Sequence, residues 1–325
     1  MPLLTSSYRA PRWLRGGHAQ TLLPVLIPRG RARPWTRERL NLSDGDFVDL
    51  FWLRQGANRL AILCHGLEGS VEANYMRGMA ATLAAVGWDV LAWNYRGCGG
   101  VENDLIRSYH SGESGDLRQV ITHAAQQHTQ LMLIGFSLGG NISLKCVGEA
   151  PPHPSVKAVV AISSPVDLAS SAQVLDEDPG NRLYLSRFLK SLKIKTLRKA
   201  KRFPELRERL IGCDGIDAVM TIKEFDERIT APLHGFANAD DYWARASALP
   251  YLEKIPIPTL LLNARNDPLL AAPSFPEELA SRSETFCLEA PAHGGHVGFV
   301  DFRAGWQPWS ERRLLEFISG IFCNV

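Results

Sequence analysis

The stretch LMLIGFSLGGNISLK, from Leu131 to Lys145, constrains the fold more than any other part of the chain. A short apolar run ends in the segment Gly135-Phe136-Ser137-Leu138-Gly139, and a helical pattern begins directly after it. A chain that turns from a strand into a helix this sharply forces the turning residue into a strained backbone conformation. Side chains two positions before and after that residue would collide, which favours glycine at both places.

This turn predicts a reactive role for Ser137. Its hydroxyl would stand at the carboxyl edge of a sheet. The next amide, on Leu138, would lie at a helix N-terminus, where partial positive charge favours an oxyanion. The pattern G-x-S-x-G also occurs by chance, and Gly135 and Gly139 could merely permit close packing of a helix on a strand. The apolar run before the turn and the helical pattern after it favour a nucleophile.

The rest of the chain predicts an α/β fold with a mostly parallel central sheet flanked by helices. Short β-rich runs are apolar without alternation, as expected for strands covered on both faces. These runs are Leu60–Cys64, Asp89–Trp93, Leu131–Gly135, Val156–Ile162, Thr259–Asn263 and Thr285–Leu288. Segments with helical spacing lie between them, including Glu72–Val86, Asp116–His128 and Leu138–Gly148. Alternation of strand and helix is typical of parallel sheets.

The alternation stops after Ile162 and resumes near Ile257. The block between them has helical periodicity and no clear strand, so we expect a helical cap, residues 167–251, inserted into the core. The core would then comprise residues 1–166 and 252–325, with residues 1–45 as an N-terminal extension. The apolar stripe of Trp309–Ile321 predicts a last helix packed on the sheet.

A serine nucleophile needs a base, and two histidines in APAHGGHVGF, His293 and His296, follow the last predicted strand. We prefer His296, because the apolar residues after it would hold the loop in place, and we keep His293 in reserve. Either histidine could instead be purely structural. H-x-x-H spacing can also bind a metal, but no third ligand or helix supports this, so no metal is predicted.

The base in turn needs an orienting acid, which should follow the preceding strand. Asp267 in TLLLNARNDPLL has this position, although Asp before Pro is also a common turn residue. Asp240, Asp241 and Asp301 are weaker candidates, because they are away from strand ends. A second oxyanion donor should come from the loop after an early strand, where ILCHGLEGS offers the Leu67 amide.

Bulk composition excludes several classes of protein. A net charge of +2 gives no indication of nucleic-acid binding, and no uninterrupted apolar stretch approaches the ~18 residues of a spanning helix. Six cysteines (64, 98, 146, 213, 287 and 323) form no C-x-x-C pair, which predicts reduced thiols in a cytoplasmic protein. We expect no signal peptide, because the apolar run near the start is short and contains Pro24.

Taken together, the segments HG (65–66), NYRGCGG (94–100), GFSLGG, NDPLL and HGGHVGF resemble the α/β-hydrolase superfamily. RGGHAQTLLP (15–24) and DDYWARASALPYLEKIPIPTLLLNARND (240–267) resemble its YheT-like branch more narrowly, over nearly the full length. The resemblance implies Ser137, Asp267 and His296 as a catalytic triad beneath a helical lid, and it leaves the substrate open. His18 could reach the site, although a structural role is the simpler interpretation.

Lys190–Arg209 holds nine Lys and Arg residues against two acidic ones, beside a stripe formed by Leu185, Phe188, Leu189 and Leu192. Such a basic amphipathic segment could contact an anionic lipid surface. The simpler interpretation, which we favour, is that the stripe packs on the core and the cations are solvated. The oligomeric state is not predictable from the sequence.

The expected activity is hydrolysis of a small-molecule carboxylic ester with a short to medium acyl chain, through an acyl-enzyme and without a cofactor. The same groups could serve an acyltransferase, a thioesterase or a lipid-acting hydrolase. A binding module without catalysis is a third interpretation, which the complete triad disfavours.

Overall fold

The computed structural model describes residues 3–27, 35–208, 215–302 and 307–322. Within these residues nine strands form one sheet in the order β1-β9-β8-β7-β6-β4-β5-β3-β2. The strands are β1 (Leu3–Leu4), β2 (Thr36–Asn41), β3 (Phe47–Leu53), β4 (Arg59–Cys64), β5 (Asp89–Asn94), β6 (Gln130–Phe136), β7 (Val156–Ile162), β8 (Thr259–Leu262) and β9 (Phe286–Glu289). All neighbouring pairs are parallel except β2 with β3 and β3 with β5. The predicted mostly parallel sheet is confirmed.

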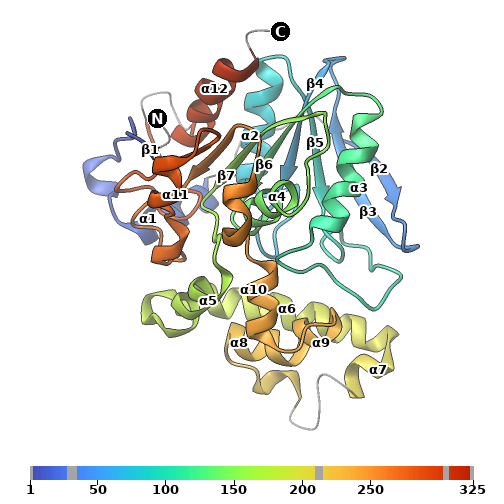
Figure 1. Cartoon of the computed structure of the whole chain (residues 1–325). Helices are drawn as coiled ribbons and strands as arrows, with labels where there is room; N and C mark the ends of the chain where they lie inside the picture. The colour runs from blue at the N-terminus through green and yellow to red at the C-terminus, as the bar shows by residue number, and fades with distance from the viewer. Residues whose placement is uncertain (1–2, 28–34, 209–214, 303–306, 323–325) are drawn as a thin grey trace.

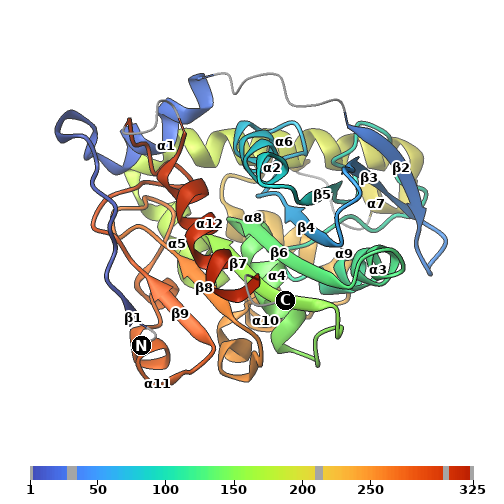
Figure 2. The same ribbon diagram turned by 90° about the horizontal axis from the view of Figure 1, so that it is seen from above.

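Helices cover both faces of the sheet (Figures 1 and 2). One face packs against α3 (Ser114–Ala125) and α4 (Leu138–Gly148), and the other against α2 (Asn74–Ala85) and α12 (Trp309–Phe322). Because β4 to β7 lie between two apolar layers, their side chains are almost all inaccessible to solvent. This explains why these strands are apolar without alternation.

The described part of residues 167–251 consists of helices joined by short turns and contains no strand, and it lies below the carboxyl ends of the strands in Figure 1. Their α-helices are α5 (Leu168–Glu177), α6 (Arg182–Arg202), α7 (Pro204–Leu206), α8 (Ile222–Phe225), α9 (Ala231–Leu233) and α10 (Ala239–Ala246). We call this segment the cap. It has an apolar core of its own, in which Leu189 of α6 is buried, while Leu185, Phe188 and Leu192 pack half-buried against that core. The two remaining helices are α1 (Gly17–Leu26) and α11 (Glu277–Arg282).

Three strands of the sheet were not predicted: β1, β2 and β3. β2 is an edge strand with the sequence TRERLN, so it lacks an apolar run. β3 does contain one, but Asp49 interrupts it. Asp49 is buried because Arg37 and Arg39 of β2 pair with its carboxylate at 2.7 and 3.3 Å. An acid that looks like a surface residue in the sequence is therefore part of the sheet.

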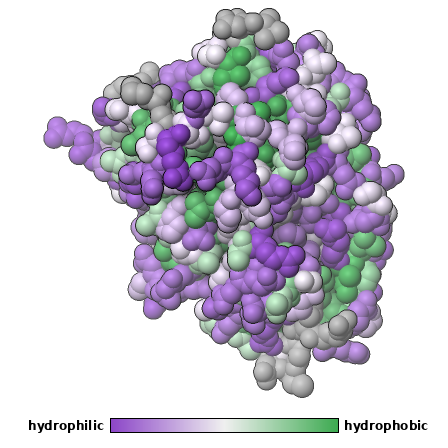
Figure 3. Space-filling view, viewed as in Figure 1, coloured by the Kyte–Doolittle hydropathy of each residue, from purple (hydrophilic) through white to green (hydrophobic). Residues whose placement is uncertain are grey.

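Within the described residues no helix is both long and apolar enough to cross a membrane. Cys64, Cys98, Cys146 and Cys287 are free thiols, whereas Cys213 and Cys323 lie outside the described residues. We call the described residues outside the cap the sheet domain. Hydrophilic residues cover most of the face seen in Figure 3, over both the sheet domain and the cap.

Candidate active site

Ser137 lies at the sharp turn between β6 and α4. Its backbone has φ +53° and ψ −123°, a conformation that an L-residue rarely adopts. Neither flanking glycine leaves room for a side chain. A Cβ on Gly135 would lie 2.3 Å from the Gly139 carbonyl oxygen, and a Cβ on Gly139 would lie 2.3 Å from the Cys64 carbonyl oxygen. The turn is therefore strained and tightly packed, and it places the Ser137 side chain at the carboxyl edge of the sheet.

The structure brings the three predicted polar residues together. His296 Nε2 lies 2.9 Å from Ser137 Oγ, and His296 Nδ1 lies 2.8 Å from Asp267 Oδ2. Asp267 follows β8, its side chain is inaccessible to solvent, and its other oxygen accepts a hydrogen bond from the Leu269 amide at 2.9 Å. One carboxylate oxygen is thereby held by the backbone, and the other faces the imidazole.

The other candidate residues lie elsewhere. His293 is half-buried, and its buried Nδ1 has no hydrogen-bond partner within the described residues. Asp301 pairs with Arg312, whereas Asp240 and Asp241 belong to α10 of the cap and pair with Lys223 and Arg245. His18 contacts the cap instead, with Nδ1 3.1 Å from the hydroxyl of Tyr184 and the two rings stacked.

The loop after β4 approaches Ser137 closely. A Cβ on Gly66 would lie 3.2 Å from the Ser137 Cβ, and the Gly66 amide donates to the Tyr75 hydroxyl at 3.0 Å. His65 is fully buried, and burial lowers its pKa to about 3, so its imidazole is neutral. Its Nε2 accepts from the Tyr95 amide, which leaves Nδ1 as the donor to the Gly66 carbonyl at 2.8 Å. His65 thus shapes this loop.

Two amides near Ser137 are available to a ligand. In the described part of the chain, neither the Leu67 amide nor the Leu138 amide donates a hydrogen bond to another residue. Leu138 is the first residue of α4, so its amide also lies at the positive end of that helix. This arrangement suits a negatively charged oxygen.

The serine and the imidazole open into a cavity of about 520 Å³ between the sheet domain and the cap. Its walls are mostly apolar. They come from α1, which contributes Leu22 and Val25, from α6, which contributes Leu183 and Phe188, and from the loops that carry Ser137 and His296. A cavity of this size and composition fits a small apolar ligand with one polar centre. Within the described residues no group of three or more His, Cys, Asp and Glu side chains could hold a metal ion.

A comparison with protein families identifies this arrangement. Residues 62–302 match the family described as the alpha/beta hydrolase fold. The chain belongs to this family. Among its relatives, the Escherichia coli protein named "Putative esterase YheT" is 34% identical over 312 residues, which cover 93% of this chain and 90% of the relative. The resemblance to the YheT-like branch is confirmed.

Two further relatives of this hydrolase-fold chain carry lipid-related names. Phospholipase ABHD3 of Homo sapiens is 25% identical, over 92% of this chain and 75% of its own length. Monoacylglycerol lipase of Saccharomyces cerevisiae is 26% identical, over 81% of this chain and 59% of its own length. Among solved structures, the esterase Pf2001 of Pyrococcus furiosus has a TM-score of 0.59 at 16% identity, covering 90% of this chain and 98% of that one. That likeness shows the fold alone.

Several residues of the hydrolase site were not predicted from the sequence. Thr21 Oγ1 accepts from the His296 amide at 2.8 Å, and Ser163 Oγ accepts from the Val297 amide at 2.8 Å, so both hold the histidine loop. The structure has five non-glycine residues with positive φ in its described part: Glu68, Ser137, Ser163, Val297 and Phe299. All five lie in loops around the site, where backbone strain is expected to concentrate. Only the strain at Ser137 had a local sequence signal.

Proposed function

We propose that the protein is a serine hydrolase that cleaves carboxylic esters through an acyl-enzyme. The observation that carries this proposal is the continuous hydrogen-bonded chain from Ser137 Oγ through the imidazole of His296 to the buried carboxylate of Asp267. A hydroxyl becomes a useful nucleophile when a neighbouring base takes its proton, and an imidazole does this when an acid holds its tautomer.

In the first step His296 Nε2 takes the proton of Ser137 Oγ while the oxygen attacks the ester carbonyl carbon. The carbonyl oxygen becomes negatively charged and is held by the Leu67 and Leu138 amides. Asp267 accepts the Nδ1–H of the imidazole and stabilises its charged form. The imidazolium then protonates the leaving alcohol, and the acyl group remains on Ser137. No metal or organic cofactor is needed for this chemistry.

In the second step a water molecule takes the position of the alcohol. His296 accepts a proton from this water, which attacks the acyl carbon, and the acid leaves with Ser137 restored. The apolar walls of the 520 Å³ cavity favour an uncharged acyl chain of short to medium length. The names of the relatives, an esterase, a phospholipase and a lipase, support an ester or lipid substrate.

A fluorophosphonate probe tests the proposal, because it reacts only with an activated serine. We expect covalent labelling of the native protein and complete loss of labelling in Ser137→Ala. Ser164→Ala is the matched control, since Ser164 is buried nearby and its hydroxyl has no hydrogen-bond partner in the described residues. The proposal fails if the native protein is not labelled or if Ser137→Ala is still labelled.

The same acyl-enzyme could transfer its acyl group to an alcohol or accept it from a thioester. An assay with a p-nitrophenyl ester distinguishes hydrolysis from transfer when a short alcohol is added. Free acid as the main product supports the hydrolase, whereas conversion of most of the substrate into a new ester would assign the protein to the acyltransferases. Hydrolysis of the matched thioester at an equal or higher rate would indicate a thioesterase.

A further inference from the structure

Glu68 has a backbone conformation that its residue type disfavours. It directly follows Leu67 in the loop after β4, and its φ is +54°, in the left-handed region that normally belongs to glycine. Its own amide donates to the Tyr109 hydroxyl at 3.0 Å. A long charged side chain at such a position persists only when the surrounding structure holds it there.

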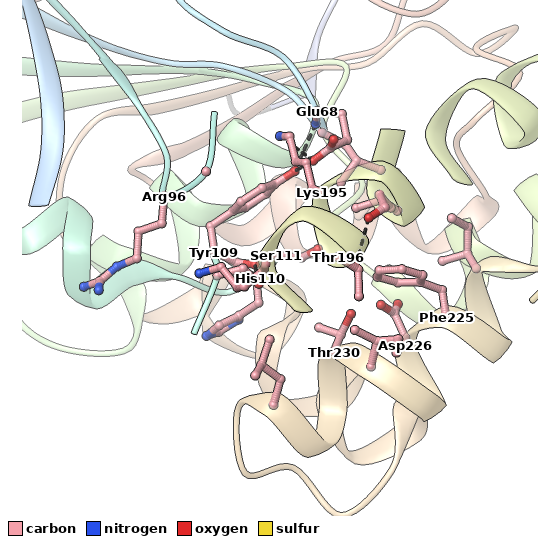
Figure 4. A pocket seen from close by; sticks show the side chains of 18 of the residues that line it. Glu68, Arg96, Tyr109, His110, Ser111, Lys195, Thr196, Phe225, Asp226 and Thr230 are labelled. Atoms are coloured by element: carbon pink, nitrogen blue, oxygen red, sulfur yellow. Dashed lines mark hydrogen bonds and ion pairs between the residues drawn. The ribbon is translucent and has the colours of Figure 1, made fainter. Parts of the chain in front are cut away.

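The contacts of the Glu68 carboxylate explain how it is held. The side chain is only 5% exposed, and Oε1 accepts from the Tyr109 hydroxyl at 2.7 Å and from Lys195 Nζ at 2.9 Å. Oε2 accepts from the Ser191 hydroxyl. In Figure 4 the Glu68 and Lys195 side chains point toward each other, with Tyr109 beside them. We call these four residues the Glu68 cluster.

The Glu68 cluster joins two separate parts of the molecule. Ser191 and Lys195 belong to α6 of the cap, whereas Glu68 belongs to the sheet domain, in the loop that approaches Ser137. Burial acts to lower the pKa of Lys195, but the Cys98 sulfur and the Glu68 carboxylate outweigh it, so this pKa is raised and the ammonium is charged. A buried carboxylate and a half-buried ammonium therefore neutralise each other.

Glu68 also forms part of the wall between two cavities. Leu67 and Glu68 line the 520 Å³ cavity that contains Ser137, and they also line a second cavity of about 110 Å³ under the cap, seen in Figure 4. If the Glu68 side chain lost its partners, its backbone could relax from the left-handed region, and the backbone directly before it, which carries the Leu67 amide, would be free to reorient. The amide would then move relative to Ser137.

We propose that Glu68 is a positioning residue that fixes the Leu67 amide beside Ser137, and that Lys195 and Ser191 make this position depend on the cap. Lys195 has a second effect, because it neutralises a carboxylate close to the place where the oxyanion develops. Removing Lys195 alone would leave two negative charges near each other in a site with little water. This inference rests on the proposed function, in which the Leu67 amide is an oxyanion donor.

Three variants test this charge relation: Lys195→Met, Glu68→Gln and the double variant. We expect Lys195→Met to lower kcat for a p-nitrophenyl ester by about 10²-fold, the size expected when an oxyanion donor is misplaced or opposed. KM should change little, because the effect is on the transition state.

The double variant should regain about tenfold over Lys195→Met, because the unpaired charge is gone. Lys195→Arg keeps the charge and should restore most of the activity.

Two other contacts between the cap and the sheet domain serve as matched controls. Lys199 donates to the carbonyl oxygens of Leu105 and Arg107 at 2.7 and 2.6 Å, and Asp104 pairs with Arg202 at 2.9 Å. Neither contact touches Glu68. Lys199→Met should lower the melting temperature, because Lys199 is buried, whereas Asp104→Asn should not, since exposed pairs contribute little. Both should keep kcat within about threefold, because neither contact holds the loop after β4.

The proposal is overturned if Lys195→Met keeps the native kcat, if Lys199→Met lowers kcat as much, or if the double variant is no better than Lys195→Met. Hydrogen exchange gives a readout that does not depend on activity: amides 66–70 should exchange faster in Lys195→Met and not in Lys199→Met. Unchanged exchange in Lys195→Met would refute the coupling. Failure of the proposed function is recognised separately, by absence of fluorophosphonate labelling of the native protein.

Discussion

The two walls of the 520 Å³ cavity beside Ser137 are held by different kinds of interaction. The wall on the sheet side rests on strands whose side chains lie between two apolar layers, so it depends mainly on the removal of apolar surface from water. The cap is joined to this wall by many polar contacts, including the Glu68 cluster and the Lys199 ammonium on two carbonyl oxygens. The rings of His110 and His234 also meet there, tilted against each other with their centroids 4.7 Å apart.

This difference matters for how the site can respond to its surroundings. Apolar burial changes little with pH, whereas buried charges and imidazoles depend on the protonation of each group. Ser137, Asp267 and His296 all lie on the sheet side, and the cap contributes mainly the apolar roof of the cavity. We therefore expect changes on the sheet side to affect the chemistry or the whole fold, and changes at the cap to affect its attachment.

The largest expected effect is that of Asp267→Asn on the sheet side. The Leu269 amide would hold the asparagine oxygen, so the NH2 group would face His296 Nδ1 and donate to it, which selects the wrong imidazole tautomer. We therefore expect a loss of at least about 10²-fold in kcat with little change in melting temperature. Asp240→Asn on the cap is the control and should keep full activity. Activity of Asp267→Asn close to the native value would assign the orienting role to another carboxylate.

The second prediction concerns stability of the sheet. Leu133 of β6 is inaccessible to solvent, and Leu133→Ala should lower the free energy of unfolding by about 2–5 kcal/mol, because it removes buried methyl groups and leaves a cavity. Denaturant unfolding should give the same loss at pH 5.5 and pH 7.5. A loss that depends on pH would contradict the contrast between the two walls.

The third prediction concerns the attachment of the cap. Burial lowers the pKa of His110 to about 3 and that of His234 to about 2, so both imidazoles are neutral in the folded protein. A histidine with a depressed pKa stabilises the fold above its unfolded pKa, near 6.5, and this stability is lost as the pH falls. Between pH 7.5 and 5.5 the loss is up to about 1.4 kcal/mol for each histidine.

Thermal unfolding at several pH values tests this prediction with His110→Asn and His234→Asn. Each variant should be less stable than the native protein at pH 7.5, and its stability should fall less steeply between pH 7.5 and 5.5. His123→Asn is the comparison, because no neighbouring imidazole stacks on that residue. Equal slopes in the native protein and both variants would show that these two histidines do not control the attachment.

The smallest expected effect concerns the outer face of α6. The stripe of Leu185, Phe188, Leu189 and Leu192 packs in the cap, but the opposite side of α6 exposes three apolar side chains among exposed cations. The apolar residues are Leu183, Ile194 and Leu197, and the cations are Arg187, Lys190, Arg198 and Lys201. Figure 2 shows α6 and α1 along the same side of the molecule. Such a surface favours an anionic lipid bilayer.

Co-sedimentation with vesicles measures this contact. Binding to vesicles with anionic lipid should exceed binding to zwitterionic vesicles, and Ile194→Asp with Leu197→Asp should reduce it by about thirtyfold, given roughly 1 kcal/mol for each group near the surface. Val86→Asp is the control, since Val86 is exposed at the end of α2, away from the cap. Negligible binding to both kinds of vesicle would leave α6 as a solvated surface.

The sequence predicted the parts of the site that have local signals. The turn at Ser137 combines a buried strand, two glycines and a helix within fifteen residues, and each of these constrains the others. Asp267 and His296 follow from the chain order of the strands, because side chains after parallel strands meet at one edge. Their side chains lie within hydrogen-bond distance of each other, and their roles in catalysis stay a prediction.

The parts that were missed depend on contacts between residues far apart in the chain. Thr21 contacts His296 across 275 positions, and Glu68 contacts Lys195 across 127. A threonine in a helix and a glutamate in a turn have no local pattern that indicates such partners. β2 was missed for the same reason, since its polar residues join the sheet by pairing with β3, where Arg37 and Arg39 also meet Asp49.

The contact between residues 8–21 and residues 296–300 has a consequence for biosynthesis. The Tyr8 hydroxyl donates to the Val300 carbonyl, the Gln20 side chain accepts from the Val300 amide, and Thr21 supports the His296 amide. During translation the earlier of these two segments leaves the ribosome almost three hundred residues before its partner. A nascent chain therefore cannot complete these contacts, or the support of the His296 loop that they provide, until nearly the whole polypeptide has emerged.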